Sequence, residues 1–149
     1  MTQKPNPEAQ RILSEIGDEP VENGRNHPGT GHLRLLFAVS PAKTITSLEM
    51  LVGHDPDGGR IASILRCFGQ LELGVLKEWG FSLIRRALQH GDVHVRDTAI
   101  QVLENWGTEK AIALLKENQE REKVPWLQDY ATRVINDIKE QNDGSKTES

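Results

Sequence analysis

Histidine and carboxylate side chains alternate at one point of the chain in a way that resembles a metal site. On a β-strand, His90, Asp92 and His94 would all project to the same side, where they could bind a transition metal. Here they fall in a turn that enters an expected helix, and alternate side chains diverge in a helix. Asp92 is better explained as the residue that caps this helix. We therefore expect no metal at this position.

Two further segments combine histidine with turn-forming residues. Residues 27–32 read His-Pro-Gly-Thr-Gly-His, without the lysine and the strand–loop–helix setting of a phosphate-binding loop. Residues 54–59 carry two carboxylates but lack the further oxygen ligands that a calcium loop needs at fixed positions. We interpret the first segment as part of a linker and the second as a turn.

Nucleophilic and aromatic residues also point to packing rather than chemistry. The single cysteine, Cys67, adjoins an inward-facing phenylalanine and is interpreted as a packing residue. The three tryptophans, Trp79, Trp106 and Trp126, fall on or beside expected inner helix faces, so we assign them to the core. The sequence predicts no catalytic residue, no metal and no cofactor, and we expect that the chain is not an enzyme.

Composition limits the remaining classes of function. The chain has 149 residues, a formal net charge of −4 and one cysteine, which excludes an intrachain disulfide. No apolar run approaches the roughly 18 residues of a membrane span, and the first residues lack the apolar stretch of a secretory signal. Residues 24–90 carry eight basic and five acidic groups, an excess too small to predict strong phosphate binding. We expect a cytoplasmic protein that does not bind membranes.

Apolar residues recur with helical spacing along most of the chain. Residues 33–39 fit either a strand or a buried helix, and we favour a helix because every later element is helical. We expect three parts: a tether over 1–31 containing one short helix and a linker, a helical domain over 32–140, and a disordered tail over 141–149. The expected helices of the domain are 33–39, 41–52, 60–71, 76–89, 93–106, 109–119 and 125–138.

An internal repeat organises the helical domain. The segment 95–103 can be laid over 127–135 at an offset of 32 residues, so that Ala99 matches Ala131 and aspartate, valine and apolar positions also coincide. A looser copy lies upstream at an offset of about 35. A small inner residue such as alanine allows a neighbouring helix to approach closely. Repeats of this length indicate stacked supersecondary units that bury their apolar faces against one another.

The segment 91–115 carries a recognisable combination of features. It has an aspartate in the turn, a Val-Arg pair, alanine and then leucine at four-residue steps, a terminal glycine, and the alanine and leucines of the following helix. This segment resembles a HEAT repeat, including the phycobilisome-lyase variety. The resemblance implies an all-α fold, a short α-solenoid of stacked antiparallel helix pairs. It also implies that Asp92 and Arg96 lie in the layers between repeats.

Stacking would align equivalent exposed positions on the second helix of each pair, the side that lines the concave surface of such arrays. The residues predicted to bind a partner there are Arg66, Thr98, Gln101, Tyr130 and Arg133. The leading hypothesis is a non-enzymatic protein–protein interaction module, such as an adaptor, an assembly factor or an immunity or anti-host binder. The partner would be another protein, or a second copy in a homodimer. The alternatives are a nucleic-acid-binding HEAT-like protein, drawing on Arg66, Arg85 and Arg86, and a chromophore lyase-like enzyme.

Overall fold

The computed structural model describes residues 28–147 apart from 56 and 72. Every regular element within these residues is an α-helix, which confirms the all-α prediction for this part of the chain. The helices are α2 (Pro28–Val39), α3 (Pro41–His54), α4 (Gly58–Gly69), α5 (Leu73–Leu88), α6 (Val93–Trp106), α7 (Glu109–Gln119) and α8 (Pro125–Thr147). The predicted tether helix lies outside the described residues.

Side-chain caps begin three of the helices. Asp57 and Thr108 each accept a hydrogen bond from the backbone N–H three residues on, and Asp92 accepts one from the N–H two residues on. These bonds satisfy backbone donors that have no partner inside the helix. Gly107 ends α6 in the left-handed conformation, with φ of 58°. Because that conformation favours glycine, the residue fixes the turn from α6 into α7.

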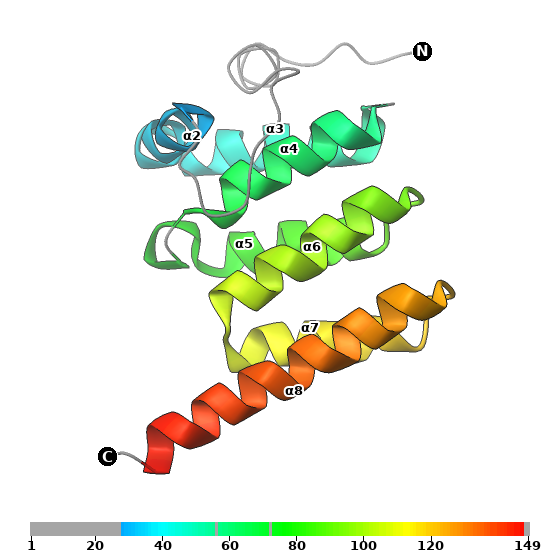
Figure 1. The fold of residues 1–149 in the computed structure, drawn as a ribbon. Helices are drawn as coiled ribbons and strands as arrows, with labels where there is room; N and C mark the ends of the chain where they lie inside the picture. Colours follow the sequence, from blue (N-terminus) through cyan, green and yellow to red (C-terminus); the bar gives the residue numbers. More distant parts are fainter. Residues whose placement is uncertain (1–27, 56, 72, 148–149) are drawn as a thin grey trace.

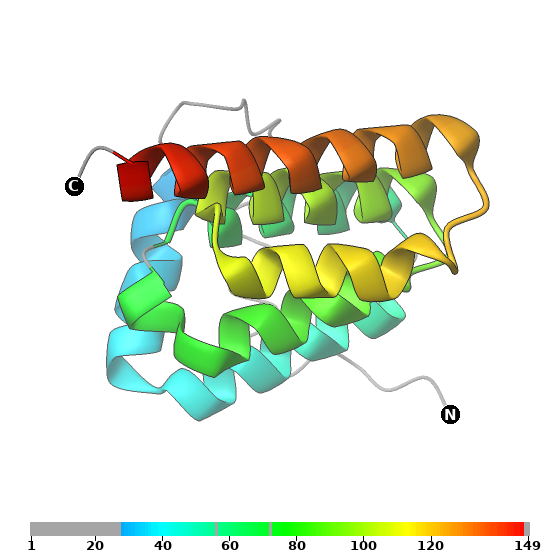
Figure 2. The ribbon, with the colours of Figure 1, turned by 90° about the horizontal axis from the view of Figure 1, so that it is seen from below.

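The helices form two rows. Figure 1 shows α4, α6 and α8 one below another on one face, with α3, α5 and α7 behind them. Figure 2, viewed from below, shows α8 and α6 on one side and α7 and α5 on the other. Each helix of the front row follows its rear partner in the chain, and α2 packs against α3, α4 and α5 at the start of the stack. The turns from α5 to α6 and from α7 to α8 therefore lie at the same end (Figure 1).

The two copies of the 32-residue repeat occupy matching environments. Ala99 is 0% exposed and its counterpart Ala131 is 5% exposed. The flanking apolar positions of both copies, Val95, Val102, Leu103, Leu127, Val134 and Ile135, are also buried. The inner face predicted from the repeat is therefore the face that each helix buries.

Two glycines of α4 allow α6 to pack closely against it. A Cβ added to Gly58 would lie 1.9 Å from Oδ2 of Asp92, and a Cβ added to Gly69 would lie 2.7 Å from a γ-carbon of Val102. Gly58 and Gly69 are the first and last residues of α4, and Asp92 caps α6. The two helices therefore approach each other closely at both ends of α4. Asp92, at the start of α6, thus lies against the first residue of α4.

Four boundary and burial predictions need correction. Residues 28–31 belong to α2 rather than to a linker, and Thr30 there is buried. The expected tail over 141–149 is helical as far as Thr147, because α8 continues along the neighbouring layer and the amide of Asn142 donates to Oε1 of Glu109 at 3.2 Å. Trp79 and Trp126 are 37% and 54% exposed, since both lie beside the apolar stripe of their helix rather than on it.

The rest of the aromatic side chains are in or against the core. Trp106 packs edge-on against Phe81 at 5.3 Å between ring centroids and lies 6.0 Å from the buried ring of Phe68. Gly80 of α5 leaves room for it, because a Cβ there would lie 3.2 Å from the Trp106 ring. The α5 helix runs through this glycine without a break.

Candidate functional site

A groove runs between the front-row helices α6 and α8. Its volume is about 740 Å³, and each helix contributes four residues to its lining. The lining residues are Asp97, Gln101, Glu104 and Asn105 from α6, and Trp126, Asp129, Tyr130 and Arg133 from α8. We call these eight residues the α6–α8 groove.

Helical spacing and the repeat together place these residues. On α6 the lining positions fall four, seven and eight residues after Asp97, so they share one face of the helix. The 32-residue offset then relates Asp97 to Asp129 and Gln101 to Arg133. The groove is therefore made by equivalent faces of α6 and α8, which are neighbours in the front row. The sequence repeat predicted a row of exposed side chains on these faces.

Tyr130 links the two helices. Its hydroxyl donates a 2.9 Å hydrogen bond to Oε1 of Glu104 on α6, and the guanidinium of Arg133 lies 5.1 Å from the ring centroid. Partial burial, with the Glu104 carboxylate next in importance, raises the pKa of Tyr130 above its usual value. The phenol therefore stays protonated at neutral pH and acts as a hydrogen-bond donor.

The groove carries more negative than positive charge. Asp97, Glu104 and Asp129 supply three carboxylates, and Arg133 is the one cation in the lining. The Gln101 amide donates to Oδ2 of Asp97 at 3.2 Å, so one of these carboxylates is also held in position. A complementary ligand would bring positive charge, because like charges repel and an unpaired carboxylate loses hydration on binding.

Trp126 adds a large apolar surface to the same groove. It is 54% exposed at the first turn of α8, beside charged and amide side chains. An exposed tryptophan next to polar groups is typical of the residues that dominate protein–protein binding energy. Sequence reasoning missed it because its position beside an apolar stripe favoured burial. The available signal was that Trp126 lies one residue before the buried Leu127, off the inner face of α8.

Three of the five predicted partner-binding residues meet in this groove. Gln101, Tyr130 and Arg133 line it, whereas Arg66 is partly buried on α4 and does not. The expectation for Thr98 is wrong. It is 1% exposed and its hydroxyl donates to the His94 carbonyl at 2.8 Å. The α6 helix packs against α4, α5, α7 and α8, so only a narrow strip of its surface stays open.

Two of the three arginines behind the nucleic-acid alternative face carboxylates. Arg85 of α5 forms an ion pair with Glu117 of α7, and Arg86 lies 4.0 Å from Glu49 of α3. Both arginines thus link layers of the rear row. Paired with carboxylates in this way, they offer less positive charge to a phosphate backbone than the sequence alone implied.

The histidine, cysteine and aspartate positions that could have carried chemistry are explained by hydrogen bonding, burial and ion pairing within the fold. Nδ1 of His90 accepts a hydrogen bond from the Asp92 N–H, and no cluster of three or more metal-binding side chains occurs within the described residues. Cys67 is fully buried, and burial raises the pKa of its thiol to about 11. Asp55, in the turn before α4, forms a two-point ion pair with Arg60 in the first turn of that helix, with N–O distances of 2.7 and 2.8 Å.

Comparisons with models of protein families, with curated proteins and with solved structures find no match for this chain. None of the helices that the structure describes combines the length and apolar character needed to cross a lipid bilayer.

Proposed function

We propose that this chain is a non-enzymatic helical-repeat module that binds another protein through the α6–α8 groove. The helices are proposed to form a short HEAT-like α-solenoid, in which α3–α4, α5–α6 and α7–α8 are successive repeats. The matching burial of Ala99 and Ala131, and the position of Asp92 against Gly58, support this assignment. Arrays of this kind bind partners along an extended helical surface.

One observation carries the proposal: an exposed tryptophan lies in a groove lined by side chains that are held in place. Trp126 supplies apolar area, while Tyr130 is fixed by its bond to Glu104 and by the guanidinium of Arg133. Tryptophan, tyrosine and arginine are the residues most enriched at binding hot spots. Side chains that are already ordered lose little conformational entropy when a partner binds.

The charge of the groove defines the partner. With three carboxylates and one arginine, it favours a segment that carries lysine or arginine next to an apolar side chain able to cover Trp126. The same charge disfavours DNA and RNA, whose phosphates would face the carboxylates. The proposed partner is therefore a protein with a basic, partly apolar segment.

A peptide-display selection against the full chain tests this proposal. The enriched peptides should contain lysine or arginine beside an aromatic or aliphatic residue. Their affinity should fall by about thirtyfold for Trp126→Ala, the loss expected at a hot spot of roughly 2 kcal/mol. The matched control is Trp79→Ala, since Trp79 is also exposed but lies on α5, outside the groove.

Three outcomes would contradict the proposal. Enrichment of acidic peptides would reverse the inferred charge preference. Equal loss of binding in the two tryptophan variants would remove the groove as the binding site. Oligonucleotide binding that weakens steeply with salt and ignores Trp126→Ala would favour the nucleic-acid alternative.

A further inference from the structure

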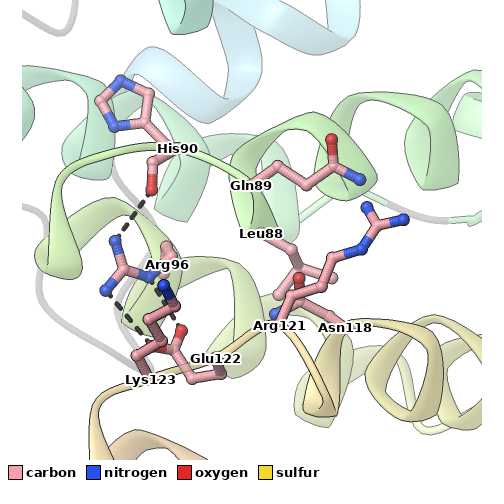
Figure 3. Close-up of a pocket in the computed structure, with 8 residues that line it drawn as sticks. All are labelled: Leu88, Gln89, His90, Arg96, Asn118, Arg121, Glu122 and Lys123. Atoms are coloured by element: carbon pink, nitrogen blue, oxygen red, sulfur yellow. Dashed lines mark hydrogen bonds and ion pairs between the residues drawn. The ribbon is translucent and has the colours of Figure 1, made fainter.

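A second cavity lies at the end of the stack where the turns from α5 to α6 and from α7 to α8 meet. Its volume is about 330 Å³, near the lower limit for small-molecule sites. Figure 3 shows the side chains of its lining, which come from the ends of α5 and α7, from both turns and from α6. It shares no lining residue with the α6–α8 groove, so the two sites can be tested separately.

The charge of this cavity is opposite to that of the groove. Arg96, Arg121 and Lys123 supply three cations, and Glu122 is the one carboxylate in the lining. The excess is notable because the whole chain has a formal charge of −4. A cavity with several cations concentrates anions, because its walls displace the water that would otherwise screen them.

The Glu122 carboxylate is already neutralised. Its two oxygens accept from Nε and Nη2 of Arg96 at 2.8 and 3.3 Å, and the Val124 N–H also donates to it at 3.1 Å. The other terminal nitrogen of Arg96 donates to the backbone carbonyl of His90 (Figure 3) and to that of Gly91. Arg96 and Glu122 therefore join the two turns and leave little net charge between them.

The remaining cations have no such partner. Neither Arg121 nor Lys123 forms an ion pair with a carboxylate in the described part of the chain, and both side chains are exposed. Both residues lie in the turn that leads to α8, and in Figure 3 the guanidinium of Arg121 is directed toward Gln89. The positive charge of the cavity is thus available to a ligand.

Asn118 is the decisive side chain. It is only 9% exposed and lines the cavity, yet its carboxamide makes no hydrogen bond with any residue that the structure describes. Its backbone carbonyl is used separately, accepting from the N–H groups of Arg121 and Glu122. Because the amide atoms of Asn118 are not among the fully buried polar atoms without a partner, a water or a ligand in the cavity can reach them and complete their hydrogen bonds. Its N–H donors belong to the same cavity lining as Arg121 and Lys123, a combination that suits an acceptor-rich ligand.

We propose that this cavity binds a small oxyanion, a phosphate or carboxylate group, through Arg121, Lys123 and the amide of Asn118. Arg96 is a positioning residue, because its bonds to Glu122 and to the α5–α6 turn hold the two sides of the cavity together. The cations supply charge-assisted hydrogen bonds. The amide of Asn118, a residue only 9% exposed, supplies a neutral N–H donor from the inner part of the lining. The chemistry shared by the two ligand groups is a set of closely spaced, negatively charged oxygens.

Nuclear magnetic resonance titration of the isotope-labelled full chain tests the proposal. Inorganic phosphate and citrate are the two probes, and sodium chloride at equal ionic strength is the reference. At least one probe should produce saturable shifts of the Asn118 side-chain amide and of the backbone amides at 89–90 and 121–123. The stronger probe identifies whether phosphate or carboxylate oxygens are preferred.

Substitutions separate a site from general charge attraction. Arg121→Gln should weaken binding of the stronger probe on the order of tenfold, as loss of a charge-assisted bond does. Arg133→Gln removes the same charge from the α6–α8 groove and should leave the affinity unchanged. Arg121 is exposed, so its replacement should not disturb the fold. Equal effects of the two substitutions, or no saturable shift beyond that of chloride, would overturn the proposal.

Discussion

The substitution Gly69→Ala tests whether α4 and α6 pack as closely as the stack requires. Alanine normally favours a helix over glycine by about 1 kcal/mol, so the change alone would stabilise the protein. At this position the new Cβ would lie 2.7 and 3.1 Å from the two γ-carbons of Val102, closer than carbon atoms pack. Overpacking of this kind costs about 1–3 kcal/mol. We therefore expect a net loss of stability of about 1 kcal/mol.

Thermal and urea unfolding, followed by circular dichroism, measure this loss. For a chain of this size, 1 kcal/mol corresponds to a fall in Tm of roughly 2–4 °C. Gly53→Ala is the matched control, because Gly53 is also helical but has no atom within 4 Å of an added Cβ. That variant should be as stable as the parent or more stable.

A double-mutant cycle with Val102→Ala attributes the effect to this contact. Val102→Ala removes the two γ-carbons and should cost about 2 kcal/mol by itself. In the double variant the clash is absent, so the combined loss should be smaller than the sum by about 1 kcal/mol or more. Strictly additive losses, or a Gly69→Ala variant that gains stability as Gly53→Ala does, would refute the packing of α4 on α6.

Three further predictions follow from the ionisable groups. Hydrogen bonding to Arg60 lowers the pKa of Asp55 in the folded protein. The ionised carboxylate therefore stabilises the fold at pH values above its unfolded pKa of about 3.9, and this stabilisation is lost as the pH falls through the lower pKa of the folded state. Asp55→Asn should therefore cost about 1–2 kcal/mol at pH 7, with a difference from the parent that shrinks in unfolding experiments below pH 4. Glu122→Gln leaves Arg96 without its carboxylate partner and should cost about 3 kcal/mol by urea unfolding, whereas a change under 1 kcal/mol would mean that this ion pair does not join the turns. The thiol of Cys67, buried and with its pKa raised to about 11, should resist a disulfide reagent at pH 8 until the protein unfolds, and rapid labelling of the folded chain would contradict its burial.

Local signals in the sequence predicted most of the helices. Asp92 caps the helix that the sequence predicts it to cap, and Thr108 and Gly107 likewise begin α7 and end α6, because each of these effects depends on a few neighbouring residues. Ser40 shows the limit of such reasoning: it occupies the position before α3, but its side chain makes no capping hydrogen bond. Pro41 at the first helical position begins α3 without one.

The groove was only partly predictable. The repeat offset placed Gln101 and Arg133 on equivalent faces, which requires only periodicity, and both line the groove. The burial of Thr98 and the exposure of Trp126 depend on which neighbouring layer covers each position, and a single sequence does not contain that information. The cavity at Asn118 was missed for the same reason, since it arises where two turns distant in sequence meet.

The charge of the α6–α8 groove is most directly tested by a charge swap with a basic peptide from the selection. Asp129→Lys should weaken binding of this peptide by about tenfold, and changing a lysine of the peptide to glutamate should restore part of the affinity for that variant. Asp137→Lys, which alters the same helix by the same charge outside the groove, should leave the dissociation constant unchanged. Equal weakening by the two substitutions, with no recovery for the altered peptide, would contradict the assignment of the groove as the protein-binding surface.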